Sequence, residues 1–208
     1  MPRCIVVCAG EYGSVDFHLE KDDYVICCDG GLSAAGKMGI KADLLMGDLD
    51  SLEGPIPNGL EVLRFPAKKD DTDSMLAIKE GLRLGFSDFL LLFSLGGRLD
   101  HTIANIQTLM FLKERGATAR LIGPNDDIQI LTEGSSLRLN RKKGYTLSVF
   151  AYGGGAKGVC LTGVEYPLKD AVLENAFPLG VGNHIVETTA DISVKEGNLL
   201  IIQSKIKS

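Results

Sequence analysis

The chain has 208 residues, of which 45% are apolar and 24% are charged, the proportions of a globular protein with a substantial core. The formal net charge of −5 disfavours nucleic acids and anionic membranes as partners, because both bind positive surfaces. Neither a signal peptide nor an apolar run of membrane-spanning length is recognisable, so a cytoplasmic protein is expected. The chain has five cysteines, an odd number, and no two of them form a CxxC motif. This predicts reduced, buried thiols.

The first half of the chain alternates short apolar runs with helical patterns. The runs predict buried strands at 4–8, 24–28, 44–46, 61–65 and 89–93. The spacing of apolar residues predicts helices over 73–84 and 102–115, the first capped by Asp71 or Thr72. Because strands alternate with helices, we expect a mostly parallel sheet covered on both faces.

The pattern changes near Pro124, after which helical periodicity disappears. Short extended runs are expected at 128–132, 136–139, 146–151, 158–162, 184–188, 192–194 and 199–203. Closely spaced runs punctuated by Gly, Asn and Asp are typical of an all-β sandwich or barrel. The sequence therefore predicts an α/β domain at 1–123 followed by a β-sandwich or β-barrel domain at 124–208.

Aspartates follow several of the predicted strands. Asp29 follows the second strand, Asp48 and Asp50 the third, and Asp100 the fifth, while Asp73 opens a helix. A single loop aspartate is more often a turn or cap residue than a ligand. In a parallel sheet, however, these loops share one edge, where ligands bind, and converging carboxylates need a counter-charge. A hard cation such as Mg²⁺ is the natural candidate, and an extended segment would point Asp48 and Asp50 the same way.

Basic and polar residues near the fifth strand fit a phosphate ligand. Arg98, preceded by two glycines, is suited to bidentate phosphate contact. His101 and Asn105 follow one helical turn apart, although a helix-end hydrogen bond explains His101 equally well. Lys68 and Lys69 can also neutralise phosphate, but adjacent loop lysines are usually a solvated surface.

Two glycine-rich segments fail the tests for nucleotide motifs. The segment 31–38 nearly matches GxxxxGK[ST], but Met38 stands where a hydroxyl must reach magnesium. The segment 153–158 matches GxGxxG, but it lies between β runs and is better explained as a glycine-rich turn.

The acidic loops resemble those of the thiamine pyrophosphokinases, also called thiamine diphosphokinases. The similarity runs along nearly the whole chain, and the order and spacing of its short motifs make it specific. The motifs are Asp29-Gly30-Gly31, Gly47-Asp48-Leu49-Asp50-Ser51, Lys69-Asp70-Asp71-Thr72-Asp73, Gly96-Gly97-Arg98-Leu99-Asp100-His101, Gly163-Val164-Glu165-Tyr166-Pro167-Leu168 and Gly182-Asn183.

The resemblance implies a homodimer whose active site lies between the α/β domain of one subunit and the β domain of its partner. It implies magnesium ligands at Asp48, Asp50 and Asp73, and thiamine contacts at Gly182 and Asn183. It places Asp29, Gly30, Gly31, Thr72, Arg98, His101 and Asn105 around ATP. Gly182 departs from the serine usual in the family, which removes a hydroxyl worth about 1 kcal/mol as a hydrogen-bond partner.

The resulting expectation is a Mg²⁺-dependent transfer of pyrophosphate from ATP to thiamine, with release of AMP. Arg98 would stabilise the charge on the transferred group, and either Asp50 or Asp100 would accept the hydroxyl proton. The alternatives are a Mg²⁺-dependent kinase that moves only the γ-phosphate to another small alcohol, and a non-catalytic module that binds thiamine or a nucleotide.

Overall fold

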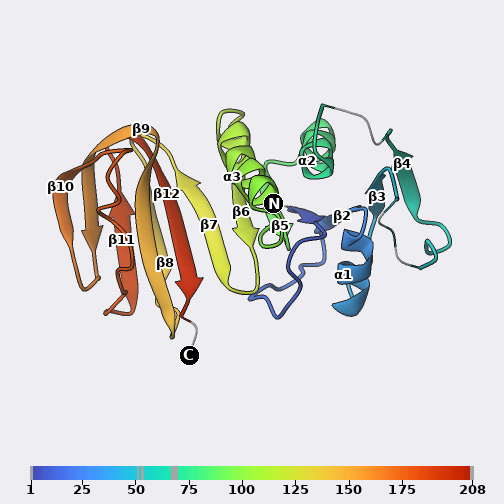
Figure 1. Cartoon of the computed structure of the whole chain (residues 1–208), viewed down its shortest axis with the longest axis horizontal. Helices are drawn as coiled ribbons and strands as arrows, with labels where there is room; N and C mark the ends of the chain where they lie inside the picture. Colours follow the sequence, from blue (N-terminus) through green and yellow to red (C-terminus); the bar gives the residue numbers. More distant parts are fainter. Residues whose placement is uncertain (1, 51, 53, 67–69, 207–208) are drawn as a thin grey trace. The chain divides into compact units, whose positions relative to one another are not determined.

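The computed structural model describes residues 2–50, 52, 54–66 and 70–206. They form two compact units, Met1–Pro124 and Asn125–Ser208 (Figure 1). The first unit carries the mixed strands and helices, and the second consists of strands and loops.

In the described part of the first unit, six parallel strands form one sheet in the order β4-β3-β2-β1-β5-β6. They are β1 (Cys4–Val7), β2 (Tyr24–Cys28), β3 (Leu44–Gly47), β4 (Glu61–Arg64), β5 (Asp88–Leu92) and β6 (Thr118–Ile122). The first five agree with the predicted runs to within about one residue, and the parallel sheet is confirmed. The strand β6 was not predicted from the sequence.

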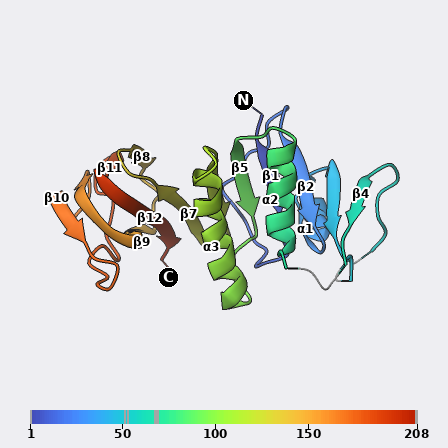
Figure 2. The ribbon, with the colours of Figure 1, turned by 90° about the horizontal axis from the view of Figure 1, so that it is seen from above.

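Three helices flank this sheet in the described residues: α1 (Gly31–Lys37), α2 (Asp73–Arg83) and α3 (Leu99–Lys113). Figure 2 shows α1 on one face and both α2 and α3 on the other. The side chains agree, since Val7 and Cys27 share a buried cluster with Ala35 of α1, whereas Gly81 of α2 lies against Cys4. Alternate residues of each strand thus face opposite helical layers.

The order of the strands determines where a ligand can bind. The chain starts at β1, builds outward to β4 on one side, and then returns to place β5 and β6 on the other side of β1. The loops after β1 and β5 therefore leave in opposite directions and open a crevice at the carboxyl edge of the sheet. Open α/β sheets bind their ligands at such a switch point.

The second unit is antiparallel. Its described strands are β7 (Asp126–Leu131), β8 (Ser136–Asn140), β9 (Tyr145–Thr162), β10 (Leu168–Leu173), β11 (Thr189–Ser193) and β12 (Glu196–Lys205). The first half of β9 pairs with β12, and its second half pairs with β10 and β11. The long strand thus passes from one sheet to the next, and their inner faces share a core that includes Leu147, Leu161 and Ile192.

Three expectations for this unit were wrong in detail. The runs 146–151 and 158–162 belong to the single strand β9, so the glycine-rich segment between them is part of a strand, and the register against β12 shifts opposite it. The run 184–188 is not a strand, because the described structure has one isolated bridge there, at Ile185, and β11 begins at Thr189. The strand β10 was missed, since its sequence lacks clear alternation.

None of the described helices is both long enough and apolar enough to cross a membrane. The apolar face of each described helix instead packs against the sheet. Ala77 and Ile78 of α2 and Leu109 and Leu112 of α3 are fully or almost fully buried.

Candidate active site

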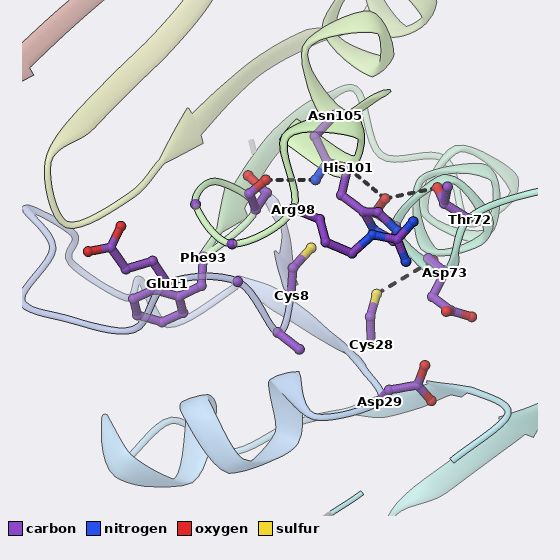
Figure 3. Close-up of a pocket in the computed structure, with 16 residues that line it drawn as sticks. Cys8, Glu11, Cys28, Asp29, Thr72, Asp73, Phe93, Arg98, His101 and Asn105 are labelled. Carbon is purple, nitrogen blue, oxygen red and sulfur yellow. Dashed lines mark hydrogen bonds between the residues drawn. The ribbon is translucent and has the colours of Figure 1, made fainter. Parts of the chain in front are cut away.

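A cavity of about 670 Å³ opens at the carboxyl edge of the parallel sheet, at the switch point between β1 and β5 (Figure 3). Its walls come from the ends of β1, β2 and β5 and from the first turns of α2 and α3. The lining residues are Cys8, Ala9, Gly10, Glu11, Cys28, Asp29, Thr72, Asp73, Ser74, Phe93, Ser94, Gly96, Gly97, Arg98, His101 and Asn105. The loop after β1, with Gly10 and Glu11, was not anticipated, although its place after the first strand was a usable signal.

Asp29 lies at the acidic end of this cavity, and its side chain is well buried. The backbone N–H of Leu49 donates a hydrogen bond of 2.9 Å to Oδ1 of Asp29. The pKa of Asp29 is raised to about 6, chiefly by burial; the N–H of Leu49 opposes this shift, and the neighbouring carboxyls of Asp73 and Asp48 add to it. The loop after β3 and the first turn of α2 thus lie close to Asp29.

Gly47 allows this crowding. A Cβ atom on Gly47 would lie 1.8 Å from Oδ1 of Asp29, and its φ of +147° is one that other residues rarely adopt. The loop after β3 can therefore approach Asp29 only because residue 47 has no side chain.

The loop after β3 is not extended, so the condition under which Asp48 and Asp50 would point the same way is not met. Leu49 has a φ of +66°, and the N–H of Asp50 donates a hydrogen bond of 3.1 Å to Oδ1 of Asp48. Because the backbone turns at Leu49, extended geometry does not align the two carboxylates. Among the described residues, no three His, Cys, Asp or Glu side chains stand together as a ready-made metal site.

The first turn of α2 brings Thr72 and Asp73 to the cavity. Thr72 is the N-cap, and its Oγ1 accepts a hydrogen bond of 3.2 Å from the N–H of Met75. The sequence predicted either Asp71 or Thr72 as the cap, and Thr72 is confirmed. Asp73 occupies the first turn, where a negative charge suits the helix dipole.

A buried chain of hydrogen bonds lies behind that turn. Thr72 Oγ1 and Ser74 Oγ share a hydrogen bond of 3.0 Å, and Ser74 Oγ donates to Oδ1 of Asn105 at 2.7 Å. The amide of Asn105 then donates to the carbonyl oxygen of Ser94 at 2.7 Å (Figure 3). The side chain of Asn105 therefore makes its bonds within the protein, between α2, α3 and the loop after β5.

Arg98 stands at the open side of the cavity, immediately before α3. Its guanidinium makes a bidentate ion pair with Asp100, with distances of 3.1 and 2.6 Å. The side chains of Arg98 and Asp100 are 73% and 63% exposed. The hydrogen bond raises the pKa of Arg98 and lowers that of Asp100, so both remain charged. The helix begins at Leu99, not at the predicted residue 102, which puts Asp100 and His101 in its first turn.

Not every predicted nucleotide residue reaches the cavity. Gly30 precedes α1 and Gly31 is its first residue, and the ideal Cβ position of Gly31 would lie 2.0 Å from the carbonyl oxygen of Val7. Close packing of α1 on β1 explains Gly31 without a ligand. Ser51, Lys68 and Lys69, which belong to the quoted motifs or the predicted phosphate contacts, lie outside the described residues.

The predicted thiamine residues lie in the second unit. Asn183 is buried, and its Oδ1 accepts hydrogen bonds from the N–H groups of Tyr166 and His184 at 3.1 and 2.8 Å. Its amide donates to the carbonyl oxygen of Tyr166 at 2.8 Å. Gly182 has a φ of +72°, which favours glycine over serine at this position.

Comparison with known protein families agrees with both units. Residues 16–121, about half of the chain, match the family described as thiamin pyrophosphokinase, catalytic domain. Residues 135–199 match thiamin pyrophosphokinase, vitamin B1 binding domain. The chain belongs to the thiamin pyrophosphokinase family.

Individual members of the thiamin pyrophosphokinase family show the same relationship. A thiamine pyrophosphokinase from Bacillus subtilis is 29% identical over 142 residues, which span 67% of this chain but only 65% of that protein. A crystal structure of thiamine pyrophosphokinase from Bacillus subtilis covers 99% of this chain and all of its own, with a TM-score of 0.90 at 23% identity. A thiamin pyrophosphokinase from Candida albicans covers 98% of this chain and 89% of its own, with a TM-score of 0.79 at 16% identity. The structural matches establish that the fold is shared.

Proposed function

We propose that this protein is a thiamine diphosphokinase, which transfers a pyrophosphate group from ATP to the hydroxyl of thiamine and releases AMP. Membership of the thiamin pyrophosphokinase family supports the reaction and both substrates. The observation that carries the proposal is the convergence of Asp29, Asp73 and Arg98 on one cavity at the switch point of the sheet. Carboxylates and a guanidinium on one cavity suit a polyphosphate with its cation.

The cavity has the dimensions of a nucleotide site. Its volume of about 670 Å³ lies within the range of small-molecule pockets, roughly 300–1,000 Å³. Thr72, Arg98 and His101 would contact ATP directly, because their side chains line the cavity. Asp29 borders the phosphate region, Gly30 and Gly31 shape the turn beneath it, and Asn105 supports the wall.

The residues present fit a Mg²⁺ ion. Asp48, Asp50 and Asp73 are proposed to hold it, with Asp29 beside them, and all four offer the oxygen atoms that this ion prefers. Asp29 and Asp73 line the same cavity, where a cation would offset their negative charges. Magnesium commonly binds through one or two carboxylates and completes its shell with water and phosphate oxygens. When bound, it would neutralise charge on the phosphate oxygens.

The proposed step forms one bond and breaks another. The hydroxyl oxygen of thiamine attacks the β-phosphorus of ATP, and the bond from that phosphorus to the oxygen bridging it to the α-phosphorus breaks, so that AMP leaves. Arg98 would stabilise the charge on the transferred group, as a guanidinium can bind two phosphate oxygens at once. Asp50 or Asp100 would accept the hydroxyl proton, and both remain candidates.

The second unit is proposed to bind thiamine and to mediate dimerisation, in a homodimer whose active site joins the first unit of one subunit to the second unit of the other. The vitamin B1 binding model over residues 135–199 supports the first role. Exposed apolar side chains at Phe177, Leu179 and Val181 support the second. Gly182 and Asn183 are the proposed thiamine residues, with Asn183 holding the turn at Tyr166. We further propose that the enzyme acts in the cytoplasm, without nucleic acid or membrane partners.

The test is an assay with ATP, Mg²⁺ and thiamine in which both products are identified. The proposal requires AMP and thiamine diphosphate in equal amounts, and turnover that stops with a chelator and returns with added Mg²⁺. Release of ADP would instead indicate a γ-phosphate kinase. Thiamine binding by calorimetry without turnover at any Mg²⁺ concentration would indicate a binding module.

A further inference from the structure

Two cysteines lie side by side in the floor of the cavity. In the parallel pair β1 and β2, Val7 is paired with Cys27, so the next residues, Cys8 and Cys28, stand opposite each other. Paired residues on neighbouring strands point to the same face of a sheet, and those strands lie about 4.8 Å apart. The two side chains therefore lie next to each other on one face of the sheet, and Figure 3 shows both of them beside the cavity.

Both cysteines are largely buried. Cys8 and Cys28 are 7% and 4% exposed, and both line the cavity wall. The thiol of Cys28 also donates a hydrogen bond of 3.5 Å to the carbonyl oxygen of Asp73, the residue proposed to hold the cation. The pair is thus placed directly beneath the proposed phosphate region.

The other three thiols lack such a partner. Cys4 stands opposite Tyr24 and Phe89, and Cys27 stands opposite Val7 and Leu45. Cys160 lies in the second unit, where its sulfur accepts a hydrogen bond from the N–H of Asp170. Cys8 and Cys28 are therefore the pair to which a reagent that needs two adjacent sulfurs would bind.

We propose that Cys8 and Cys28 form a bidentate site for a trivalent organoarsenical, and that its occupation closes the cavity to a nucleotide. An arsenoxide, R–As=O, condenses with two thiols to give R–As(S)₂. Two As–S bonds form, the As=O bond breaks, and the two thiol protons leave with the oxygen as water. No electron transfer is needed. The second As–S bond forms within one molecule, so two adjacent thiols bind far more tightly than one.

The loss of nucleotide binding rests on the proposed function, whereas the dithiol site does not. We would therefore measure the two effects separately on the full chain, with phenylarsine oxide as the probe. Mass spectrometry should show one phenylarsenic group per chain, and thiol titration after denaturation should show two thiols consumed. Peptide mapping should place the group on Cys8 and Cys28. A small dithiol should remove it, whereas an equal concentration of a monothiol should not.

The variants Cys8→Ser and Cys28→Ser should each weaken the binding by about 10²-fold or more, because each leaves a single sulfur. Cys160→Ser is the matched control and should bind like the wild type. Two separate variants keep the test decisive if one of them unfolds. Unchanged binding in either folded variant, or one thiol consumed per arsenical, would overturn the dithiol site.

Competition with ATP tests the second part of the proposal. Excess ATP with Mg²⁺ should slow modification of the wild type, and the modified chain should no longer bind ATP. If the arsenical bridges Cys8 and Cys28 but ATP neither protects nor is excluded, closure of the cavity is refuted while the dithiol site stands. Failure of the kinase assay alone would contradict the proposed function without affecting the mass measurements.

Discussion

Ser74 and Asn105 are joined by a buried hydrogen bond of 2.7 Å that links the first turn of α2 to α3. Asn105 continues the connection to the carbonyl oxygen of Ser94 at the end of β5. Two helices and a strand end that all border the cavity are thus connected through one side-chain amide. We therefore propose that Asn105 positions Thr72 and Asp73.

Ser74→Ala tests this connection. It would leave the side-chain oxygen of Asn105 buried without its donor, which typically costs about 1–3 kcal/mol of stability. We expect urea denaturation to show that loss, and steady-state kinetics to show a raised KM for ATP with a smaller change in kcat. Ser74→Thr, which keeps the hydroxyl, should recover part of the lost affinity for ATP.

The control for Ser74 is Ser33→Ala in α1, where no side-chain hydrogen bond is present in the described structure. This variant should match the wild type in stability and KM. Equal KM values for wild type and Ser74→Ala would show that the buried bonds support only the fold.

Gly47→Ala should disrupt the acidic loop. The added methyl group would overlap the Asp29 carboxylate, at 1.8 Å from Oδ1, and would require a φ unsuited to alanine. We expect activity to fall by about 10²-fold, as displaced catalytic geometry commonly costs, together with a higher Mg²⁺ requirement. Gly36→Ala in α1 is the control, because its Cβ position is open and its φ is not positive. Normal Mg²⁺ dependence in Gly47→Ala would show that the loop after β3 does not take part in Mg²⁺ binding.

Asp73→Asn should remove most of kcat while preserving the fold, because it keeps the shape of the side chain and removes its charge. A loss of about 10²-fold or more is expected for a group that stabilises charge in the transition state. Asp70→Asn, at an exposed position in the loop before α2, is the control and should retain activity. Calorimetric titration of Mg²⁺ with ATP present should show weakened binding only in Asp73→Asn. Wild-type turnover in that variant would remove Asp73 from the proposed metal ligands.

Much of the first unit could be predicted because its strands are continuous apolar runs. Cys4–Val7 and Tyr24–Cys28 are buried on both faces, so their sequences carry a simple signal. The strand β6 was harder, since Thr118 and Arg120 interrupt its apolar residues. In the second unit, the run 153–158 was misread because glycines usually mark turns, whereas here they permit a bulge within a strand.

The site was only partly readable from the sequence. The sequence could place Asp29 and Arg98 together, because both follow strands of a parallel sheet, whose carboxyl ends share one edge. The contact between Ser74 and Asn105 depends on helix packing, and the position of Cys8 beside Cys28 depends on the register between β1 and β2. Such relationships join residues that are far apart in the chain, and local pattern does not encode them.

Arg98→Lys should reduce kcat although the charge is retained. A lysine cannot form the two parallel hydrogen bonds that a guanidinium makes to a phosphate or to Asp100. We expect kcat to fall by about 10²-fold or more, with little change in thermal stability because the ion pair is exposed. The matched control is Arg138→Lys, another exposed arginine paired with an aspartate, Asp191. A kcat equal to that of the wild type in Arg98→Lys would argue against bidentate contact.

The interactions of Asp23 predict how the free energy of unfolding depends on pH. Its carboxylate accepts a hydrogen bond of 2.8 Å from Nε of Arg3 and another from the N–H of Glu20. Burial is the largest single influence and raises the pKa, but the hydrogen bonds from Arg3 and Glu20 and the charge of Arg3 together outweigh it, so the pKa of Asp23 lies below its ordinary value of 3.8. Because the folded pKa is the lower one, this stabilisation is complete above about pH 4 and disappears as the pH falls through the folded pKa.

Asp23→Asn should therefore lower the free energy of unfolding by about 1–3 kcal/mol at pH 7, the usual range for hydrogen bonds to a charged group. Urea denaturation from pH 7 to pH 2.5 should show the difference from the wild type shrinking below pH 4. Asp191→Asn, which removes an exposed partner of Arg138, should give a much smaller difference across the same range, since exposed pairs contribute little. A constant difference at all pH values would show that Asp23 stabilises the fold through its shape and not through its charge.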